Sequence, residues 1–353
     1  MALTYKQSVL VRGSIPALRE HGETITSLFY ANMLRAHPEL HDMFNTANQA
    51  NGRQPRALTS VILAFAANLN HTAELIPRLE RMCNKHCSLN IRPEHYDIVG
   101  KYLLEAFGQI LGPTWTPEVQ QAWHKAYSLL AKMLIGREAQ LYRDFELGAG
   151  WGPTAFRKFR IERKVAETDD IYSFYLVPVD GRRLPAFLPG QYVTVRVAVP
   201  AIHHLQMRQY SLSEAPRPDH YRVTIKRDTG TQVGKGAEAL RLHPGAVSNL
   251  LIDDKQAGDT VELSHPAGDF HLDTDASSTL PLTRTPGDEY GVRLDLAVMD
   301  RGQLHLEHGG AEYYICGSEA FMAETSAYLL AQGVDETRVH YEWFTTGDPE
   351  FKH

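Results

Sequence analysis

The spacing of apolar residues changes near residue 150, and this change limits the possible folds more than any other feature of the sequence. Over residues 58–69, apolar side chains recur every three or four positions, which is the stripe of an amphipathic helix. Over residues 193–199, valines alternate with other side chains at a period of two, which is typical of a strand. One helical bundle or one β-sandwich cannot use both periods, so the sequence predicts separate helical and β parts.

The first 147 residues are expected to be entirely helical. Apolar stripes run over residues 58–69, 75–86, 96–110 and 123–141. Pro93 and Pro117 stand just before two of these stripes, where the first turn of a helix tolerates proline. The glycine-rich stretch from Gly148 to Pro153 then predicts a linker.

Two further parts follow the linker. Residues 153–271 contain short alternating runs separated by Gly and Pro, which favours an antiparallel β-barrel or sandwich with an irregular loop over Gly230–Gly245. Residues 272–353 end in a buried strand, a helix and a second strand, which indicates a small α/β domain. These three elements cover residues 313–316, 319–332 and 338–344. A chain of 353 residues is long enough for the three domains, 1–147, 153–271 and 272–353.

Composition and charge exclude several classes of protein. Hydrophobic residues make up 43% and charged residues 22%, as in chains that bury a core. With 36 Lys and Arg against 42 Asp and Glu, the formal charge is −6, so no positive field would attract nucleic acid or anionic lipid to the chain as a whole. No apolar run approaches the roughly 18 residues that span a membrane. Three cysteines are too few for a disulfide framework and no signal peptide is apparent, so we expect a cytoplasmic protein.

His86 is a candidate functional residue because it is in phase with the apolar stripe of residues 75–86. A single histidine on an apolar face is most often an ordinary core residue. Here Tyr96 and Glu138 lie on the apolar faces of other predicted helices, and a carboxylate buried there needs a partner. A histidine that binds a metal through one ring nitrogen donates its other N–H to such an acceptor. Glu138 could instead pair with Arg137 or remain exposed.

Cys83 and Cys87 flank His86, which raises the alternative of a zinc site. No fourth ligand follows at a recognised spacing. We therefore expect both cysteines to be small apolar residues of the core.

The β part carries the most distinctive motif of the chain, Arg208-Gln209-Tyr210-Ser211-Leu212-Ser213. Its arginine can form two parallel hydrogen bonds to a diphosphate, its tyrosine can stack on a flat heterocycle, and its serine can hydrogen-bond to a ring nitrogen. A second motif, Pro189-Gly190-Gln191-Tyr192, opens the preceding strand. The alternative is an ordinary edge strand with a surface arginine, and the presence of both motifs counts against it.

Six short segments of the helical part share a pattern with a known family. They are Leu28-Phe29-Tyr30, Pro38-Glu39-Leu40, Met43-Phe44-Asn45, residues 51–58, Lys85-His86 and residues 96–100. They resemble the globin domain of flavohaemoglobins. The two motifs of the β part, with residues 266–270, are similar to the FAD-binding barrel of the ferredoxin-reductase family, as found in flavohaemoglobins. The resemblance implies a multidomain chain: an all-α globin, an antiparallel β-barrel FAD domain and an α/β NAD-binding domain.

For the globin domain, the resemblance implies a haem b. His86 matches the proximal ligand of the iron, and Tyr96 and Glu138 match the residues that support this ligand. The matching residues on the opposite, distal side are Tyr30, Gln54 and Leu58. Two further matches to cofactor-binding positions are Phe44, which wedges the haem in the family, and Lys85.

For the β-barrel, the resemblance implies FAD. The residues matched to flavin contacts are Tyr192, Arg208, Gln209, Tyr210 and Ser211. The segment Val247-Ser248-Asn249 resembles the one expected at the FAD diphosphate. Near the end of the chain, Phe344 matches an aromatic residue that covers the flavin, and Glu342 matches an acid near the haem–flavin junction.

The third domain departs from the family. The family holds the diphosphate of NAD(P)H with a G-G-x-G-x-T-P loop at a helix N-terminus, and this sequence has no such loop. Between Leu272 and Tyr313 there are 40 residues, so roughly 50 of those that the family needs are absent. Ser318 stands where the family usually has proline. We therefore expect a truncated NAD(P)-binding domain.

The function that the resemblance implies is that of a nitric oxide dioxygenase. Haem iron on His86 would bind O₂, Tyr30 and Gln54 would hold it, and reaction with NO would give nitrate. NAD(P)H would reduce FAD, which would return an electron to the iron. Because the nucleotide loop is missing, the alternative is a haem protein that binds O₂ or NO, with a degenerate reductase and an external electron donor. A flavin reductase without haem would require His86 to be a plain core residue.

Overall fold

The chain forms two compact units, Met1–His271 and Leu272–His353. The computed structural model describes residues 3–44, 52–69, 71, 75–149, 156–233, 240–272, 296–299 and 301–342. The first unit contains both the helical part and the β part that the sequence predicts. The division between the units falls at the predicted start of the third domain, whereas the limit between the first two domains stays a prediction.

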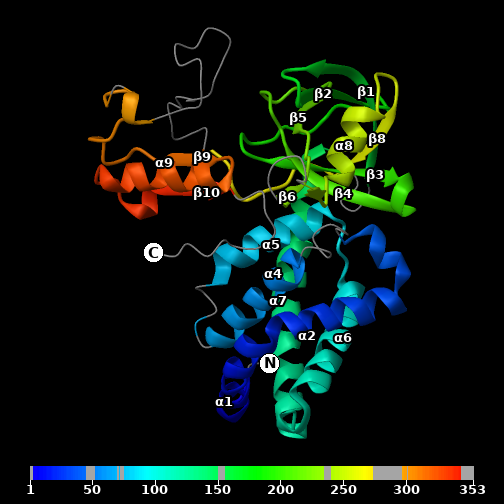
Figure 1. Ribbon diagram of the computed structural model, residues 1–353, viewed down its shortest axis with the longest axis vertical. Helices are drawn as coiled ribbons and strands as arrows, with labels where there is room; N and C mark the ends of the chain where they lie inside the picture. The colour runs from blue at the N-terminus through cyan, green and yellow to red at the C-terminus, as the bar shows by residue number, and fades with distance from the viewer. Residues whose placement is uncertain are drawn as a thin grey trace. The chain divides into compact units, whose positions relative to one another are not determined.

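The N-terminal part is helical, as the apolar stripes predict (Figure 1). Its elements are α1 (Tyr5–Gly13), α2 (Ile15–Ala36), η1 (Pro38–Asp42), α4 (Arg53–Ala67), α5 (Ile76–Ser88), α6 (Pro93–Leu111), η3 (Gly112–Thr114) and α7 (Pro117–Ala149). Proline opens α6 and α7, where the missing N–H costs no helical hydrogen bond. Helix α7 extends through Gly148 and Ala149, so the predicted linker begins too early; residues 150–155 lie outside the described part of the chain.

An antiparallel sheet of six strands follows, in the order β4-β3-β8-β1-β2-β5. The strands are β1 (Arg157–Ala166), β2 (Ile171–Pro178), β3 (Tyr192–Val199), β4 (His204–Ser211), β5 (Tyr221–Lys226) and β8 (Thr260–Leu263). A single bridge between Leu212 and Val223 joins the two ends of this order, so the sheet curls into the expected barrel. Helix α8 (Ala246–Asp253) packs against it.

The expectation of an irregular loop over Gly230–Gly245 is wrong in part. Strands β6 (Thr231–Val233) and β7 (Leu240–Leu242) lie there and pair antiparallel, with Thr231 opposite Leu242. Each strand has only three residues, which is too short for an alternating pattern to stand out among the neighbouring glycines. Residues 234–239 between them are not described.

The second unit contains the β-α-β pattern that the sequence predicts. Strand β9 (Tyr313–Cys316) leads into α9 (Glu319–Ala331), and β10 (Val339–Glu342) pairs parallel with β9. Ser318, at the position where the family usually has proline, caps α9 by accepting a hydrogen bond from the Phe321 N–H. The expectation that β9 is buried throughout is wrong, because only Ile315 is buried and Tyr314 is 40% exposed. Three short 3₁₀ turns complete the described elements: η4 (Pro200–Ile202) in the first unit, and η6 (Leu296–Val298) and η7 (Glu336–Arg338) in the second.

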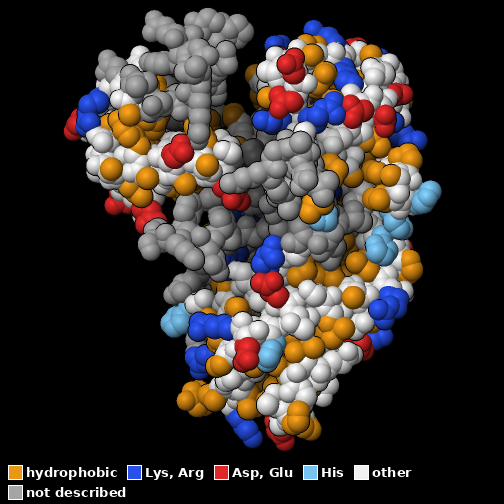
Figure 2. All heavy atoms as spheres, viewed as in Figure 1, with side chains coloured by type: hydrophobic (Ala, Val, Ile, Leu, Met, Phe, Trp, Pro, Cys, Tyr) orange, Lys and Arg blue, Asp and Glu red, His pale blue; other side chains and the backbone are white. Residues whose placement is uncertain are grey.

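The surface of the barrel carries both signs of charge. Figure 2 shows Lys and Arg side chains interspersed with Asp and Glu over β1, β2 and β5, and neither sign covers that face. Within the described residues, no helix is both long and apolar enough to cross a membrane.

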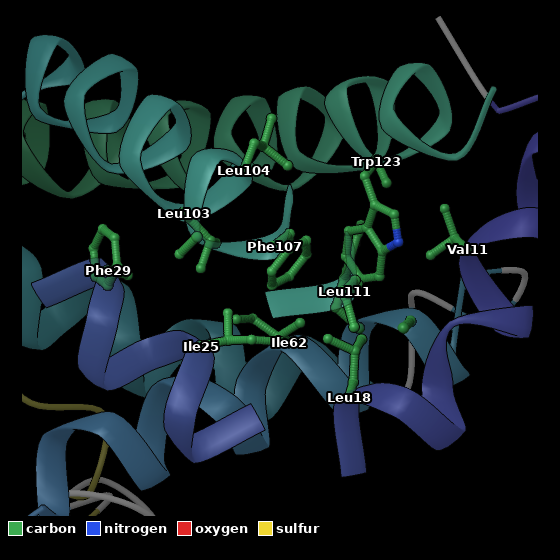
Figure 3. Packing of buried hydrophobic residues seen from close by; sticks show 14 of the residues in the cluster. Val11, Leu18, Ile25, Phe29, Ile62, Leu103, Leu104, Phe107, Leu111 and Trp123 are labelled. Atoms are coloured by element: carbon green, nitrogen blue, oxygen red, sulfur yellow. The ribbon is translucent and has the colours of Figure 1, made fainter. Parts of the chain in front are cut away.

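The helical part has its own core, which lies between α2, α4, α6 and α7 (Figure 3). Phe107 is fully buried at its centre and meets Trp115 and Trp123 edge to face, with ring centroids 5.4 and 5.0 Å apart. Ile25, Ile62 and Leu103 pack around it. This core fixes the helices that form the walls of an apolar pocket.

Candidate functional site

The apolar pocket lies between α2, η1, α4, α5, α6 and α7. Five residues singled out from the sequence line it together: Tyr30, Phe44, Leu58, His86 and Tyr96. The rest of the lining is mostly aliphatic or aromatic and includes Phe29, Leu40, Met43, Val61, Ile62, Phe65, Met82, Ile91, Val99, Leu103 and Leu134. Such walls favour a largely apolar ligand.

His86 is held by a buried acid and a buried phenol. Its Nδ1 lies 2.8 Å from Glu138 Oε1 and 2.9 Å from the Tyr96 hydroxyl oxygen. The Tyr96 hydroxyl donates a hydrogen bond of 2.5 Å to the same Oε1 of Glu138. A carboxylate can only accept, so the proton of the neutral imidazole belongs on Nδ1. The lone pair of Nε2 is then available to a metal.

Glu138 is neither paired with Arg137 nor exposed, which were the two alternatives that the sequence left open. Arg137 pairs with Glu80 instead, through hydrogen bonds of 2.6 and 2.7 Å, and Glu138 itself is only 3% exposed. Burial raises the pKa of Tyr96, and the Glu138 carboxylate raises it further, so the phenol keeps its proton and remains a donor.

Cys83 and Cys87 are buried beside this group, as expected for core residues. Their thiols donate to the backbone carbonyls of Leu134 and Glu138, at 3.9 and 3.8 Å. Burial raises the pKa of both thiols, which keeps them protonated. The described residues contain no group of three or more His, Cys, Asp or Glu that could hold a metal ion, so the zinc alternative gains no support there.

A close helix contact holds Tyr96 in place. The Tyr127 hydroxyl of α7 donates a 2.5 Å hydrogen bond to the carbonyl of Tyr96 in α6. The Tyr127 ring can approach because residue 100 is glycine: a Cβ there would lie 2.4 Å from the ring. The sequence alone indicated neither of these contacts.

The lining of the pocket includes a second polar side chain, Tyr30. Tyr30 of α2 is hydrogen-bonded to the side chain of Gln54 in α4, and burial raises the pKa of its phenol. The Phe44 ring lies edge to face with that of Tyr30, with centroids 5.5 Å apart. The pocket is thus lined both by His86 and by the Tyr30 phenol, and the Gln54 amide is the hydrogen-bond partner of that phenol.

His95 also lines the pocket, and sequence reasoning missed it. Its Nδ1 accepts a hydrogen bond of 3.0 Å from the N–H of Arg92, which caps the start of α6. The only signal in the sequence was its position directly before Tyr96.

The two motifs of the β part lie on neighbouring strands. In the antiparallel pair β3 and β4, Tyr192 is opposite Ser211 and Thr194 is opposite Gln209. Because side chains alternate along a strand, Tyr192, Gln209 and Ser211 share one face. Arg208 and Tyr210 share the other, where they lie with Val193 and Val195.

The face that carries Arg208 and Tyr210 has features that call for an anionic, hydrogen-bonding ligand. Burial lowers the pKa of Lys85, and the nearby Arg208 lowers it further, which places two cations close together. The hydroxyl of Tyr210 is buried and makes no hydrogen bond with the described residues. Such a group costs free energy unless a ligand satisfies it.

Comparison with known proteins gives consistent results. Residues 27–134 match the globin family. A flavohemoprotein of Bacillus subtilis is 41% identical over 405 residues, which cover 97% of each chain. The chain belongs to the flavohemoprotein family. This membership supports an oxidoreductase, and it confirms the family that the motifs predict.

Two further comparisons show how much of this chain is similar to known proteins. The flavohemoprotein of Deinococcus radiodurans is 47% identical over 270 residues, which are 76% of this chain and 63% of the relative. The crystal structure of flavohemoglobin from Malassezia yamatoensis with bound FAD and heme has a TM-score of 0.78 at 24% identity. That alignment covers 98% of this chain and 100% of the other, so the two share the fold.

The remaining predicted site residues lie in other elements or outside the described part of the chain. In the flavohemoprotein described here, Val247–Asn249 lies at the start of α8, where the Asn249 side chain binds the backbone of Asp228. Glu342 ends β10 in the second unit and accepts a weak hydrogen bond from Cys316. Phe344 lies outside the described residues.

Proposed function

We propose that this flavohemoprotein is a nitric oxide dioxygenase, which converts NO and O₂ to nitrate. The observation that carries the proposal is the arrangement around the apolar pocket. His86 lines the pocket and is fixed by Glu138 and Tyr96, and Tyr30 also lines it and is hydrogen-bonded to Gln54. Haem b and FAD are the cofactors that its flavohemoprotein and globin relatives support.

The pocket fits haem better than a bare metal ion. One histidine cannot fill the coordination sphere of an ion by itself, whereas haem brings four ring nitrogens and needs an apolar, flat cavity. When bound, the haem supplies the iron at which NO and O₂ react, and FAD supplies the electrons for that iron. His86 would hold the iron through Nε2, and Phe44 and Leu58 would pack against the ring.

Glu138 and Tyr96 set the chemical character of the ligand. By accepting a hydrogen bond from the Nδ1–H group, the carboxylate makes the imidazole a stronger electron donor. Tyr96 keeps this carboxylate in place without competing for its charge, because the raised pKa of the phenol leaves it neutral. Together, Glu138 and Tyr96 strengthen the electron donation of the His86 imidazole to a bound metal.

Tyr30 and Gln54 would bind the oxygen substrate. A hydroxyl and an amide donate hydrogen bonds to an oxygen ligand that carries partial negative charge. Because burial raises the pKa of Tyr30, the phenol remains a donor through the neutral and mildly alkaline range.

The FAD site rests on β3 and β4. Tyr192, Gln209 and Ser211 provide an aromatic ring, an amide and a hydroxyl on one face for the flavin. Arg208 and Lys85 provide positive charge for an anionic group, and the buried Tyr210 hydroxyl can bond the cofactor. Glu342 and Phe344 are included in this proposal on the resemblance alone.

NAD(P)H is the proposed source of hydride, through a shortened NAD-binding domain. The alignment with the Bacillus subtilis relative is 405 residues long, more than the 353 residues of this chain, which supports a deletion here. The missing glycine-rich loop also favours a second candidate function: a haem protein that binds O₂ or NO and whose flavin is reduced by an external donor.

One anaerobic experiment separates the two functions. The protein loaded with haem and FAD is mixed with NADH or NADPH and followed at the Soret and flavin bands. The dioxygenase proposal predicts rapid bleaching of the flavin, then ferrous haem, and nitrate formation once O₂ and NO are added. Haem reduction by chemically reduced FAD, without any bleaching by NADH or NADPH, would support the second function. A chain that takes up neither haem nor FAD would overturn both.

A further inference from the structure

Helix α5 has two functional faces. His86 points into the apolar pocket, whereas Asn84 and Ser88 are buried against the barrel and bond to its residues. With about 3.6 residues per turn, positions 84 and 88 share one face of a helix and position 86 lies on the opposite face. The helix that carries the proposed iron ligand is therefore hydrogen-bonded to the proposed flavin platform (Figure 1).

The contact at Ser88 is a chain of three hydrogen bonds. Gln209 Nε2 lies 3.2 Å from Thr194 Oγ1, and Thr194 Oγ1 lies 2.9 Å from Ser88 Oγ. The Ser88 hydroxyl then donates a 2.8 Å bond to the carbonyl of Lys85, the residue before His86. Both hydroxyl residues are completely buried, at 0% exposure.

The donors and acceptors in this series of hydrogen bonds can be assigned in one direction only. A carbonyl cannot donate, so the Ser88 proton must point to Lys85, and Ser88 must accept from Thr194. Thr194 has then used its single proton and must accept from Gln209. This requirement selects one of the two orientations of the Gln209 amide: the NH₂ group faces Thr194, and the carbonyl oxygen remains an acceptor.

A second hydrogen bond from the same face of α5 reaches Gly268, which packs against Tyr192 of the other flavin motif. Asn84 Oδ1 accepts a 3.1 Å hydrogen bond from the N–H of Gly268. Gly268 has φ +126, and a Cβ there would lie 3.1 Å from the ring of Tyr192. Helix α5, which carries His86, therefore supports Tyr192 through Gly268 and Gln209 through Thr194.

We propose that Ser88 and Thr194 are positioning residues for the flavin: they hold the Gln209 amide with its carbonyl oxygen free to accept a hydrogen bond from the cofactor. Two buried hydroxyls between packed elements stay satisfied only while this chain is intact, so its direction is stable. The proposal rests on the proposed binding of FAD beside Gln209. It adds that a residue on the haem-ligand helix controls how tightly the barrel binds FAD.

The test measures FAD affinity rather than turnover. The full-length chain with haem is stripped of FAD and titrated with FAD, following the quenching of flavin fluorescence. Thr194→Val keeps the side-chain shape and removes the hydroxyl, and it should weaken FAD binding by about tenfold. Ser88→Ala lets Thr194 donate to a flipped Gln209, and it should weaken binding by about threefold. Thr194→Ser should restore nearly full affinity.

Two controls separate positioning from a structural effect. Ser173→Ala removes another buried barrel hydroxyl, one that bonds Glu167 and Thr224 instead, and it should leave FAD affinity unchanged. In a Gln209→Leu background the amide is absent, so Thr194→Val should cause no further loss.

The outcomes distinguish this inference from the proposed function. If the unmodified chain binds no FAD, the proposed function itself fails. If it binds FAD while Thr194→Val and Ser88→Ala bind equally tightly, only the positioning role is overturned. A loss for Thr194→Val that persists unchanged in the Gln209→Leu background also overturns it, because the hydroxyl would then act on the fold and not through the amide.

Discussion

Among single residues, Glu138 has the greatest influence on the proposed iron ligand, because its Oε1 accepts from both His86 and Tyr96. Glu138→Gln retains an oxygen that can accept both bonds and removes the negative charge. We expect the iron–histidine stretching band of the ferrous protein to move to lower frequency, and nitrate formation to fall about 10- to 100-fold. Resonance Raman spectroscopy measures the band. Glu80→Gln is the matched control, since Glu80 pairs with Arg137 and does not contact His86. An unchanged band in Glu138→Gln would contradict the assignment.

Tyr30 carries the second prediction at this scale. Tyr30→Phe keeps the ring packing against Phe44 and removes the hydroxyl that is hydrogen-bonded with Gln54. Loss of one donor to the bound oxygen should raise the O₂ dissociation rate by about tenfold. Since the pKa of this phenol is raised, the O₂ dissociation rate of the unmodified protein should stay constant as the pH rises past 10, the ordinary pKa of tyrosine. Flash photolysis measures both. Tyr221→Phe removes a buried barrel hydroxyl and should change neither.

At the scale of helices, the contact between α6 and α7 gives a stability prediction. Gly100→Ala places a methyl group 2.4 Å from the Tyr127 ring, so the two helices must separate. We expect a loss of about 1–3 kcal/mol in the free energy of unfolding, although alanine is the better helix former. The displacement should also disturb the bond from Tyr127 to Tyr96 and so the Soret spectrum.

Gly136→Ala in α7 is the matched control for this change. Nothing lies within 4 Å of a Cβ at Gly136, so helix propensity acts alone there and should stabilise the chain by about 0.5–1 kcal/mol. Urea unfolding measures both variants. Equal effects of the two substitutions would show that the close approach of Tyr127 has no energetic importance.

Elements were easier to predict from this sequence than the contacts between them. The 3.6-residue period identified α4 to α7, and the period of two identified β1, β3 and β5, because burial of one face imposes these patterns. Strands β6 and β7 were missed because three residues carry too little pattern. Nothing in a periodic pattern indicates that Ser88 meets Thr194 or that Gly100 meets Tyr127, since such pairs depend on how elements pack. For the site, the local reasoning placed His86, Tyr96 and Glu138 together, whereas Tyr30 and Gln54 came from the resemblance alone.

For the molecule as a whole, the first unit combines the haem pocket and the flavin strands in one compact body. Polar contacts join them at several described points, among them Asn84 with Gly268 and Ser88 with Thr194, which are buried, and Asp42 with the N–H of Leu205, which is partly exposed. The proposed electron transfer from flavin to iron needs a fixed separation, which a junction of this kind would supply. In the proposed function, reduction by NAD(P)H would depend in addition on the second unit.

The same junction should make the first unit sensitive to acid. His265 follows β8, is 4% exposed, and stacks on Phe145 of α7 with ring centroids 3.5 Å apart. Burial lowers the pKa of its imidazole to about 4, from an ordinary value near 6.5. The folded state therefore excludes a proton that the unfolded state binds. This contribution to stability is fully present above pH 6.5 and is lost as the pH falls towards 4, by at most about 3 kcal/mol.

His265→Asn removes the titrating group and keeps a polar side chain of similar reach. The melting temperature of this variant should fall less steeply between pH 6.5 and 4 than that of the unmodified protein, as followed by the loss of the Soret band. His124→Asn, which changes an exposed histidine of α7, should follow the unmodified curve. If His265→Asn retained the full acid dependence, the proton uptake would have to occur elsewhere. The stack of His265 on Phe145 would then hold the helical part to the barrel by packing alone.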